Sequence, residues 1–140
     1  MHPVALVVDT GPLVAAAVRN DPDHAACAEL LKREAGSLVV PTLVLAEASY
    51  LVRKALGAAA EAALLRAAAR GEFRLEPPGP SDLERMAELV ERYADLPLGA
   101  VDASIVVTAE RLGEVNVATL DRRHFTVVRP AHVEAFTLLP

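Results

Sequence analysis

The sequence contains four carboxylates in positions where simple solvation is not the expected role: Asp9, Glu47, Asp102 and Asp121. Asp9 directly follows the apolar run 4–8, and Asp121 follows the apolar run 115–120. Such runs are typical of strands buried on both faces, so both aspartates are predicted to stand at the carboxyl ends of strands. Ligands of open parallel sheets bind outside these ends, which makes both positions candidates for chemistry.

The other two carboxylates are predicted to lie on apolar faces of helices. Glu47 is in the middle of a predicted helix, with Val44 and Leu51 about one turn away. Asp102 opens another helix, with Ile105 one turn further along. This spacing places both carboxylates on the faces that pack against a core. A carboxylate buried there must be protonated, paired with a cationic side chain or bound to a metal ion.

Each carboxylate also has an ordinary structural explanation. Asp9 could cap a helix, Asp102 could interact favourably with the positive end of a helix dipole, and Asp121 could be a turn residue. A buried Glu47 could pair with an arginine such as Arg53 or Arg123. In a parallel sheet, however, the helix that follows a strand begins at the edge where that strand ends, so all four carboxylates can converge on one pocket.

Four converging carboxylates predict a cation. Two like charges about 4 Å apart repel by roughly 4 kcal/mol at an effective dielectric constant of 20, so the group would not stay ionised without a counter-ion. Oxygen ligands without cysteine or histidine favour Mg²⁺ or Mn²⁺ over zinc. Such metal sites bind phosphate esters and activate water for in-line attack. The residues themselves therefore suggest metal-dependent phosphodiester chemistry.

The elements that would position these residues alternate between strands and helices. Strands are predicted at 4–8, 38–40, 73–76, 115–120 and 126–128, and helices at 13–18, 21–35, 43–56, 58–70, 81–93 and 101–112. A capping box of Ser81 and Glu84 is expected to open the fifth of these helices. This alternation predicts an α/β fold with three layers, in which a central, mostly parallel sheet is flanked by helices.

Length and composition limit the remaining possibilities. The 140 residues predict one domain spanning 1–140, and 53% hydrophobic residues argue against disorder. The single cysteine, Cys27, excludes a disulfide framework and a thiolate zinc site. Neither a signal peptide nor a membrane span is recognisable, so a cytoplasmic location is expected. The net charge of −5 and the 4% aromatic content argue against a passive nucleic-acid binder that relies on bulk charge or base stacking.

Four segments together resemble the PIN-domain nucleases, and in particular the VapC-type toxins of toxin–antitoxin pairs. They are residues 7–13 (VVDTGPL), 45–48 (LAEA), 102–109 (DASIVVTA) and 118–125 (ATLDRRHF). The resemblance extends over nearly the whole chain. It implies that the metal-binding and catalytic acids of the family are Asp9, Glu47, Asp102 and Asp121, the residues already selected on physical grounds.

The resemblance also implies a function and partners. It implies Mg²⁺- or Mn²⁺-dependent hydrolysis of RNA, with tRNA or rRNA as substrate, by a homodimer that a cognate antitoxin holds inactive. Thr10 and Thr119 would support the acids. The arginines that could hold RNA phosphates are Arg122, Arg123, Arg19 and Arg53. Surface solubility or internal pairing is an equally weighted explanation for these arginines. His124 is expected to pack beside Phe125 or to contact RNA, not to act as a base.

Parts of the sequence also fit three other functions. The Asp9-Thr10-Gly11 triplet also occurs in aspartic proteases, but those enzymes are built from strands and need two such aspartates. A phosphoaspartate phosphatase would need an aspartate at position 11, which is glycine. The main alternative is a catalytically silent RNA-binding or protein-interaction module on the same fold.

An apolar groove between the helices that follow Pro12 and Pro41 is the expected antitoxin site.

Overall fold

The computed structural model describes residues 5–140 and contains an alternation of short strands and helices. In chain order the elements are β1 (Leu6–Val8), α1 (Thr10–Ala17), α2 (His24–Arg33), β2 (Leu38–Pro41), α3 (Thr42–Leu56), α4 (Ala58–Ala69), β3 (Arg74–Glu76), α5 (Pro80–Arg92), α6 (Ala100–Leu112), β4 (Asn116–Ala118), α7 (Arg122–Val127) and β5 (Thr137–Leu139).

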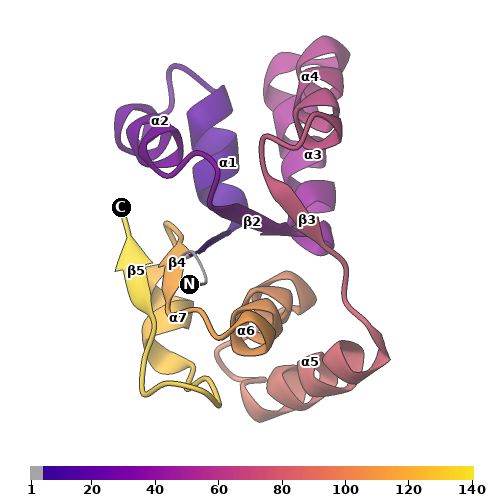
Figure 1. Ribbon diagram of the computed structural model, residues 1–140, viewed down its shortest axis with the longest axis vertical. Helices are drawn as coiled ribbons and strands as arrows, with labels where there is room; N and C mark the ends of the chain where they lie inside the picture. The colour runs from indigo at the N-terminus through magenta and orange to yellow at the C-terminus, as the bar shows by residue number, and fades with distance from the viewer. Residues whose placement is uncertain (1–4) are drawn as a thin grey trace.

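The five strands form one sheet in the order β3-β2-β1-β4-β5, and every neighbouring pair is parallel. Figure 1 shows α1 to α4 on one side of this sheet and α5 and α6 on the other. The predicted three-layer α/β architecture is therefore confirmed. Because β1 and β4 pair directly, with Val8 opposite Ala118, the segments that follow these two strands emerge side by side at one edge.

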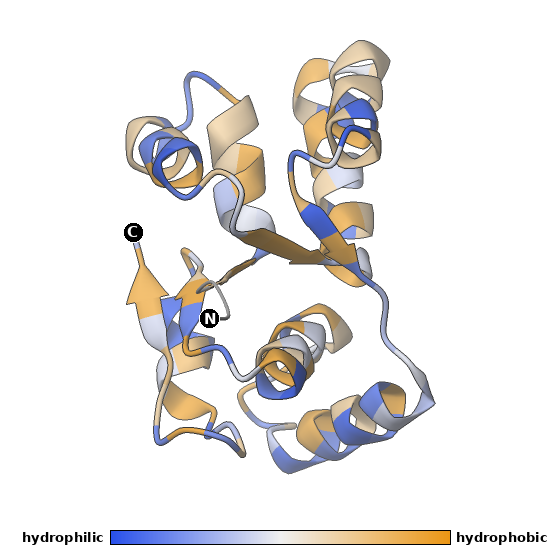
Figure 2. Ribbon diagram, in the orientation of Figure 1, coloured by the Kyte–Doolittle hydropathy of each residue, from blue (hydrophilic) through white to orange (hydrophobic). Residues whose placement is uncertain are grey.

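The core lies between the sheet and its helices. Val7, Val8, Val40 and Val117 in the strands are fully buried, as expected for a parallel sheet covered on both faces. Figure 2 shows hydrophobic colouring along β1 and β2, whereas hydrophilic and hydrophobic residues alternate along α5. The helix α6 is buried from Ala103 to Ala109, directly after the half-buried Asp102 in its first turn.

A network of charged side chains attaches the edge strand β3 to the helices beneath it. Glu76, only 8% exposed, contacts Arg74 and also accepts a 2.9 Å hydrogen bond from Arg111 of α6. Arg111 in turn donates to Asp82 of α5 over 3.2 Å. Burial raises the pKa of Glu76, but the hydrogen bonds from Arg111 and Arg74 outweigh that effect and hold the pKa below its ordinary value. The network therefore contains an ionised, buried carboxylate with its charge compensated.

Several predicted boundaries were wrong. The segment 126–128 is not a strand, because α7 runs through Val127 and buries Phe125 and Val128 on one face. The capping box of α5 involves Gly79 and Asp82 in place of Ser81 and Glu84, since the Gly79 N–H donates to Asp82 Oδ2 over 3.0 Å.

The strand β5 was not predicted, and β1 begins at Leu6 in the structure. Position 4 of the predicted first strand lies outside the described residues. Within the part of the chain that the structure describes, no helix is long and apolar enough to cross a membrane.

Candidate metal centre

Asp9 stands where β1 ends and α1 begins. It is the N-cap of α1, with its Oδ1 accepting a 2.8 Å hydrogen bond from the Thr10 N–H. Its other oxygen, Oδ2, accepts a 2.8 Å hydrogen bond from the hydroxyl of Thr119. The ordinary explanation, a helix cap, is therefore correct for one oxygen.

The environment of Asp9 nevertheless opposes its negative charge. The residue is 7% exposed, and burial raises its pKa to about 6 against the lowering effect of its two hydrogen bonds. The charges of Asp102 and Glu47 raise the pKa further. A carboxylate that folding holds in such surroundings is typical of a functional site.

Asp102 lies in the first turn of α6, and one of its oxygens makes two contacts. Its Oδ2 accepts a hydrogen bond from Gly99 N–H over 3.3 Å, which caps the helix. The same Oδ2 lies 3.2 Å from Nδ1 of His124. Burial raises the pKa of Asp102, with smaller contributions in the same direction from Asp121 and Glu47.

Asp121 is the N-cap of α7, so it begins a helix three residues after β4 ends. Its Oδ1 accepts from the His124 N–H over 3.1 Å, and its Oδ2 lies 2.7 Å from Nδ1 of the same histidine. Its own N–H donates to the Thr119 hydroxyl over 2.9 Å. Thr119 thus connects Asp9 and Asp121 through a single hydroxyl.

Glu47 does not occupy the environment predicted for it. Its side chain is exposed, because the buried face of α3 is formed by Val44, Leu45, Ala48 and Val52. Within residues 5–140 no ion pair involves Glu47, and Arg53 instead pairs with Glu61 over 3.0 Å. The charge of Glu47 still raises the pKa of both Asp9 and Asp102, so Glu47 borders the same group of acids from the solvent side.

The ligand atoms closest to one another come from Asp102, Asp121 and His124, all within 4.8 Å. Asp9 and Glu47 lie around this group and contribute negative charge. The residues present fit a divalent cation, because the carboxylates of Asp102 and Asp121 lie beside a buried His124 Nδ1 that has no aligned hydrogen bond, and burial raises the pKa of Asp102.

The two predicted supporting threonines differ in their contacts. Thr119 is 1% exposed and binds Asp9 directly, while also accepting the Asp121 N–H. Thr10 is 5% exposed, but its Oγ1 has no hydrogen-bond partner in the described part of the chain. Only its backbone N–H contacts Asp9.

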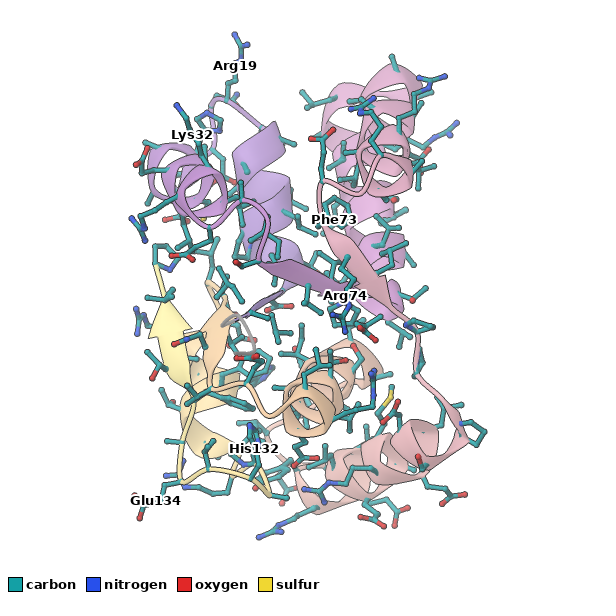
Figure 3. All side chains as sticks on the ribbon, viewed as in Figure 1. Arg19, Lys32, Phe73, Arg74, His132 and Glu134 are labelled. Carbon is teal, nitrogen blue, oxygen red and sulfur yellow. The ribbon has the colours of Figure 1, made fainter. Side chains whose placement is uncertain are left out.

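The predicted RNA-contacting arginines are divided between two regions. Arg122 and Arg123 directly follow Asp121, and Arg122 donates to the Pro140 carbonyl over 3.0 Å. The charge of Arg53 is engaged by Glu61. Arg19 follows the end of α1 opposite to Asp9, and Figure 3 shows it at the outer edge of the molecule. The structure therefore brings only Arg122 and Arg123 near the acids.

Sequence reasoning missed the part that His124 plays in this geometry. The signal was present as a spacing, because His124 comes three residues after Asp121 at the start of a helix. Residues three apart in a helix lie on the same face. His124 was expected to pack beside Phe125 or to contact RNA, and Phe125 makes an edge contact with Phe136.

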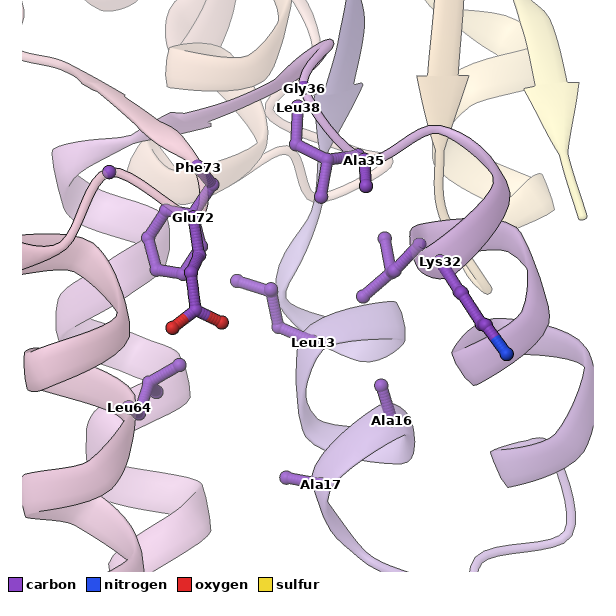
Figure 4. A pocket seen from close by; sticks show the side chains of 12 residues that line it. Leu13, Ala16, Ala17, Lys32, Ala35, Gly36, Leu38, Leu64, Glu72 and Phe73 are labelled. Carbon is purple, nitrogen blue, oxygen red and sulfur yellow. The ribbon is translucent and has the colours of Figure 1, made fainter.

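A separate apolar groove of about 520 Å³ lies on the other side of α1. Its walls are supplied by Leu13, Ala16 and Ala17 of α1, Leu31 and Lys32 of α2, Leu64 of α4, and the segments around Ala35–Leu38 and Gly71–Phe73. Figure 4 shows Leu13, Leu64 and Phe73 pointing into it. The helix after Pro12 lines this groove as expected, but α3, the helix after Pro41, contributes no lining residue.

Comparison with known proteins identifies relatives of the whole chain. The PIN domain family matches residues 6–129. The chain is 40% identical over 135 residues to Ribonuclease VapC26 of Mycobacterium tuberculosis, covering 96% of this chain and 100% of that protein.

Solved structures show the same fold. The crystal structure of the sarcin–ricin loop cleaving toxin VapC20 of Mycobacterium tuberculosis has a TM-score of 0.80 at 20% identity, over 93% of this chain and 99% of that one. A DNA-bound VapBC2 structure from Rickettsia felis has a TM-score of 0.68 at 16% identity, over 98% and 100% of the two chains. With residues 6–129 matched, the chain belongs to the PIN domain family.

Proposed function

We propose that this protein is a divalent-metal-dependent endoribonuclease that acts as the toxin of a toxin–antitoxin pair. The observation that carries the proposal is the group of acids in which Asp9, Asp102 and Asp121 meet at one sheet edge. The 40% identity to a curated ribonuclease supports RNA as the substrate, with tRNA and rRNA as the candidate classes.

Asp9, Glu47, Asp102 and Asp121 are the residues proposed to hold Mg²⁺ or Mn²⁺. When bound, the ion lowers the pKa of water and stabilises charge on the phosphate. The protein's own contribution is to hold the carboxylates before the ion arrives, through the Asp9–Thr119 hydrogen bond and the caps of α6 and α7. Arg122 and Arg123, which directly follow Asp121, are proposed to bind phosphates of the RNA.

The test is RNA cleavage by purified protein that is free of antitoxin. We expect Asp102→Asn and Asp121→Asn each to lower the cleavage rate by at least about 100-fold, because each removes a charge that binds the ion. Asp95→Asn, the same substitution at an exposed position in the turn between α5 and α6, is the matched control. Wild-type activity in both site variants would show that the acids are not the active site. RNA binding without cleavage would favour a catalytically silent module.

The partner is proposed to be an antitoxin that places an apolar segment in the groove between α1, α2 and α4. Solved VapBC complexes share this fold, which supports a protein partner of this kind. Ala16→Glu places a charge in the groove and is expected to abolish co-purification with the product of an adjacent small reading frame. Ala63→Glu, on the exposed face of α4, is the control. Retained co-purification of the Ala16 variant would exclude this groove.

We further propose that the chain is one nuclease domain over 1–140, that it works in the cytoplasm, where tRNA and rRNA are found, and that it forms a homodimer. The exposed apolar side chains of Tyr50 and Leu83 are available for such an interface. Light scattering on purified protein measures the dimer directly.

A further inference from the structure

The imidazole of His124 occupies an unusual position between two acids. Its Nδ1 lies 2.7 Å from Asp121 Oδ2 and 3.2 Å from Asp102 Oδ2. Neither contact is aligned as a hydrogen bond, and Nδ1 is buried without a hydrogen-bond partner among the described residues. The nitrogen is therefore held close to two carboxylate oxygens that do not satisfy it.

The separations of Nδ1 from the two oxygens match that of neighbouring ligands around one small cation, and all three atoms lie within 4.8 Å of one another. Ligands at right angles on an octahedral ion, each about 2.1 Å from it, lie about 3.0 Å apart. The two observed separations, 2.7 and 3.2 Å, fall on either side of that value. A single ion in contact with Nδ1 and both oxygens requires little rearrangement of the side chains.

The backbone also fixes the histidine in this position. His124 is in the first turn of α7, and its N–H donates to Asp121 Oδ1 over 3.1 Å. His124 thus donates to the helix cap with its backbone N–H and faces the acids with its ring nitrogen. Its side chain is 17% exposed, which limits the alternative positions of the ring.

We propose that His124 is a nitrogen ligand of the divalent ion, together with Asp102 and Asp121. The inference rests on the metal centre of the proposed function, and it changes the ligand set from oxygen only to mixed nitrogen and oxygen. An imidazole ligand favours first-row transition metals over Mg²⁺, which prefers oxygen. The centre therefore binds Mn²⁺ in preference to Mg²⁺, and His124 is the source of that preference.

The test is pulsed electron paramagnetic resonance of the full-length protein loaded with Mn²⁺ alone. A coordinated imidazole gives modulations from ¹⁴N that carboxylates cannot give. We expect these modulations in the wild type and their loss in His124→Gln. The matched control is His132→Gln, because His132 also has a buried Nδ1 without a hydrogen-bond partner among the described residues, but its Nε2 lies 2.6 Å from the Glu114 carbonyl, beyond the end of α6 opposite to Asp102.

Calorimetric titration with Mn²⁺ and with Mg²⁺ gives a second readout. Substitution of groups that only orient a ligand weakens metal binding by about 10–100-fold, so loss of a ligand in His124→Gln should weaken Mn²⁺ binding at least about tenfold. The effect on Mg²⁺ should be smaller. Circular dichroism of each variant confirms that it is folded.

The proposal is overturned if the Mn²⁺-loaded wild type lacks ¹⁴N modulations, or if His124→Gln retains them. Because the wild-type spectrum alone decides the first outcome, a variant that fails to fold does not rescue the proposal. Failure of the proposal that His124 is a ligand is also distinguishable from failure of the proposed ribonuclease function. RNA cleavage that depends on Asp102 and Asp121, without nitrogen coupling, would leave the enzyme established and exclude His124 as a ligand.

Discussion

The hydroxyl of Thr119 lies 2.8 Å from Asp9 Oδ2 and donates to it, although the two residues are separated by 110 positions in the chain. The same hydroxyl accepts the N–H of Asp121. One side chain therefore aligns the acid that follows β1 with the acid that follows β4. The parallel pairing of the two strands makes this possible.

Thr119→Val is expected to destabilise the protein by about 1–3 kcal/mol, because the isosteric change leaves buried polar groups on Asp9 and Asp121 without their partner. Metal affinity should fall as well, since Asp9 loses its orientation. Urea unfolding and calorimetry measure the two effects. The control is Thr126→Val, whose exposed hydroxyl donates only to nearby carbonyls of α7 and should contribute less than about 0.5 kcal/mol. Equal effects of the two substitutions would contradict the role given to Thr119.

The raised pKa of Asp9 predicts how stability without metal depends on pH. The pKa of Asp9 is about 6 in the folded protein, against an ordinary value of 3.8 that applies to the unfolded chain. At a pH between these two values, Asp9 therefore holds a proton in the folded state that it lacks in the unfolded state. Raising the pH through this window removes the proton and lowers the free energy of unfolding, by up to roughly 3 kcal/mol.

Asp9→Asn removes this pH dependence. In the presence of a chelator, the variant should be more stable than the wild type at pH 8 and similar to it at pH 4. Urea unfolding of both proteins at the two pH values tests the difference. The pH dependence that other carboxylates contribute is the same in both proteins and cancels in the comparison. A difference that is the same at both pH values would show that Asp9 ionises normally.

The side chain of Leu120 closely approaches Gly11. A Cβ added at Gly11 would lie 3.3 Å from Cβ and Cδ1 of Leu120. Gly11→Val should therefore cost about 1–3 kcal/mol and displace the turn that carries Asp121. Adding Leu120→Ala to this variant should recover most of the loss. Chemical unfolding of the single and double variants measures the coupling, and simple additivity would contradict it.

Arg111→Met should destabilise the attachment of β3 without affecting metal affinity. About 1–2 kcal/mol is expected, because Glu76 keeps Arg74 as a partner and about a third of Arg111 is exposed. The pKa of Glu76 is lowered, so the contribution is present above its ordinary pKa of 4.5 and is lost as the pH falls below that value. Urea unfolding at pH 7 and pH 3 tests this. An undiminished effect at pH 3 would exclude the ionised pair as the cause.

The sequence was sufficient to predict the layers of the fold and the convergence of the acids. Strands such as β1 and β2 are continuous apolar runs, and the helices between them have clear start and stop residues. Asp9 and Asp121 could be placed at strand ends by this pattern alone, because parallel strands end at a common edge.

The errors have local physical causes. The β-branched residues of 126–128 favour a strand, but the cap supplied by Asp121 and the burial of Phe125 and Val128 favour a helix. Glu47 was predicted to be buried because Val44 and Leu51 lie one turn away, yet the buried face of α3 is rotated towards Ala48 and Val52. The position of His124 depended on a three-residue helix spacing in the segment between two predicted strands, 115–120 and 126–128, where no helix was predicted.

The two simultaneous contacts of Asp102 Oδ2 have an evolutionary consequence. Because one oxygen of this residue both caps the most deeply buried helix and faces the acids, a mutation that inactivates the enzyme here also weakens the fold. Glu47, exposed and unconnected to any helix cap, has no such second role. Inactive descendants of this protein that remain folded should therefore lose Glu47 far more often than Asp102.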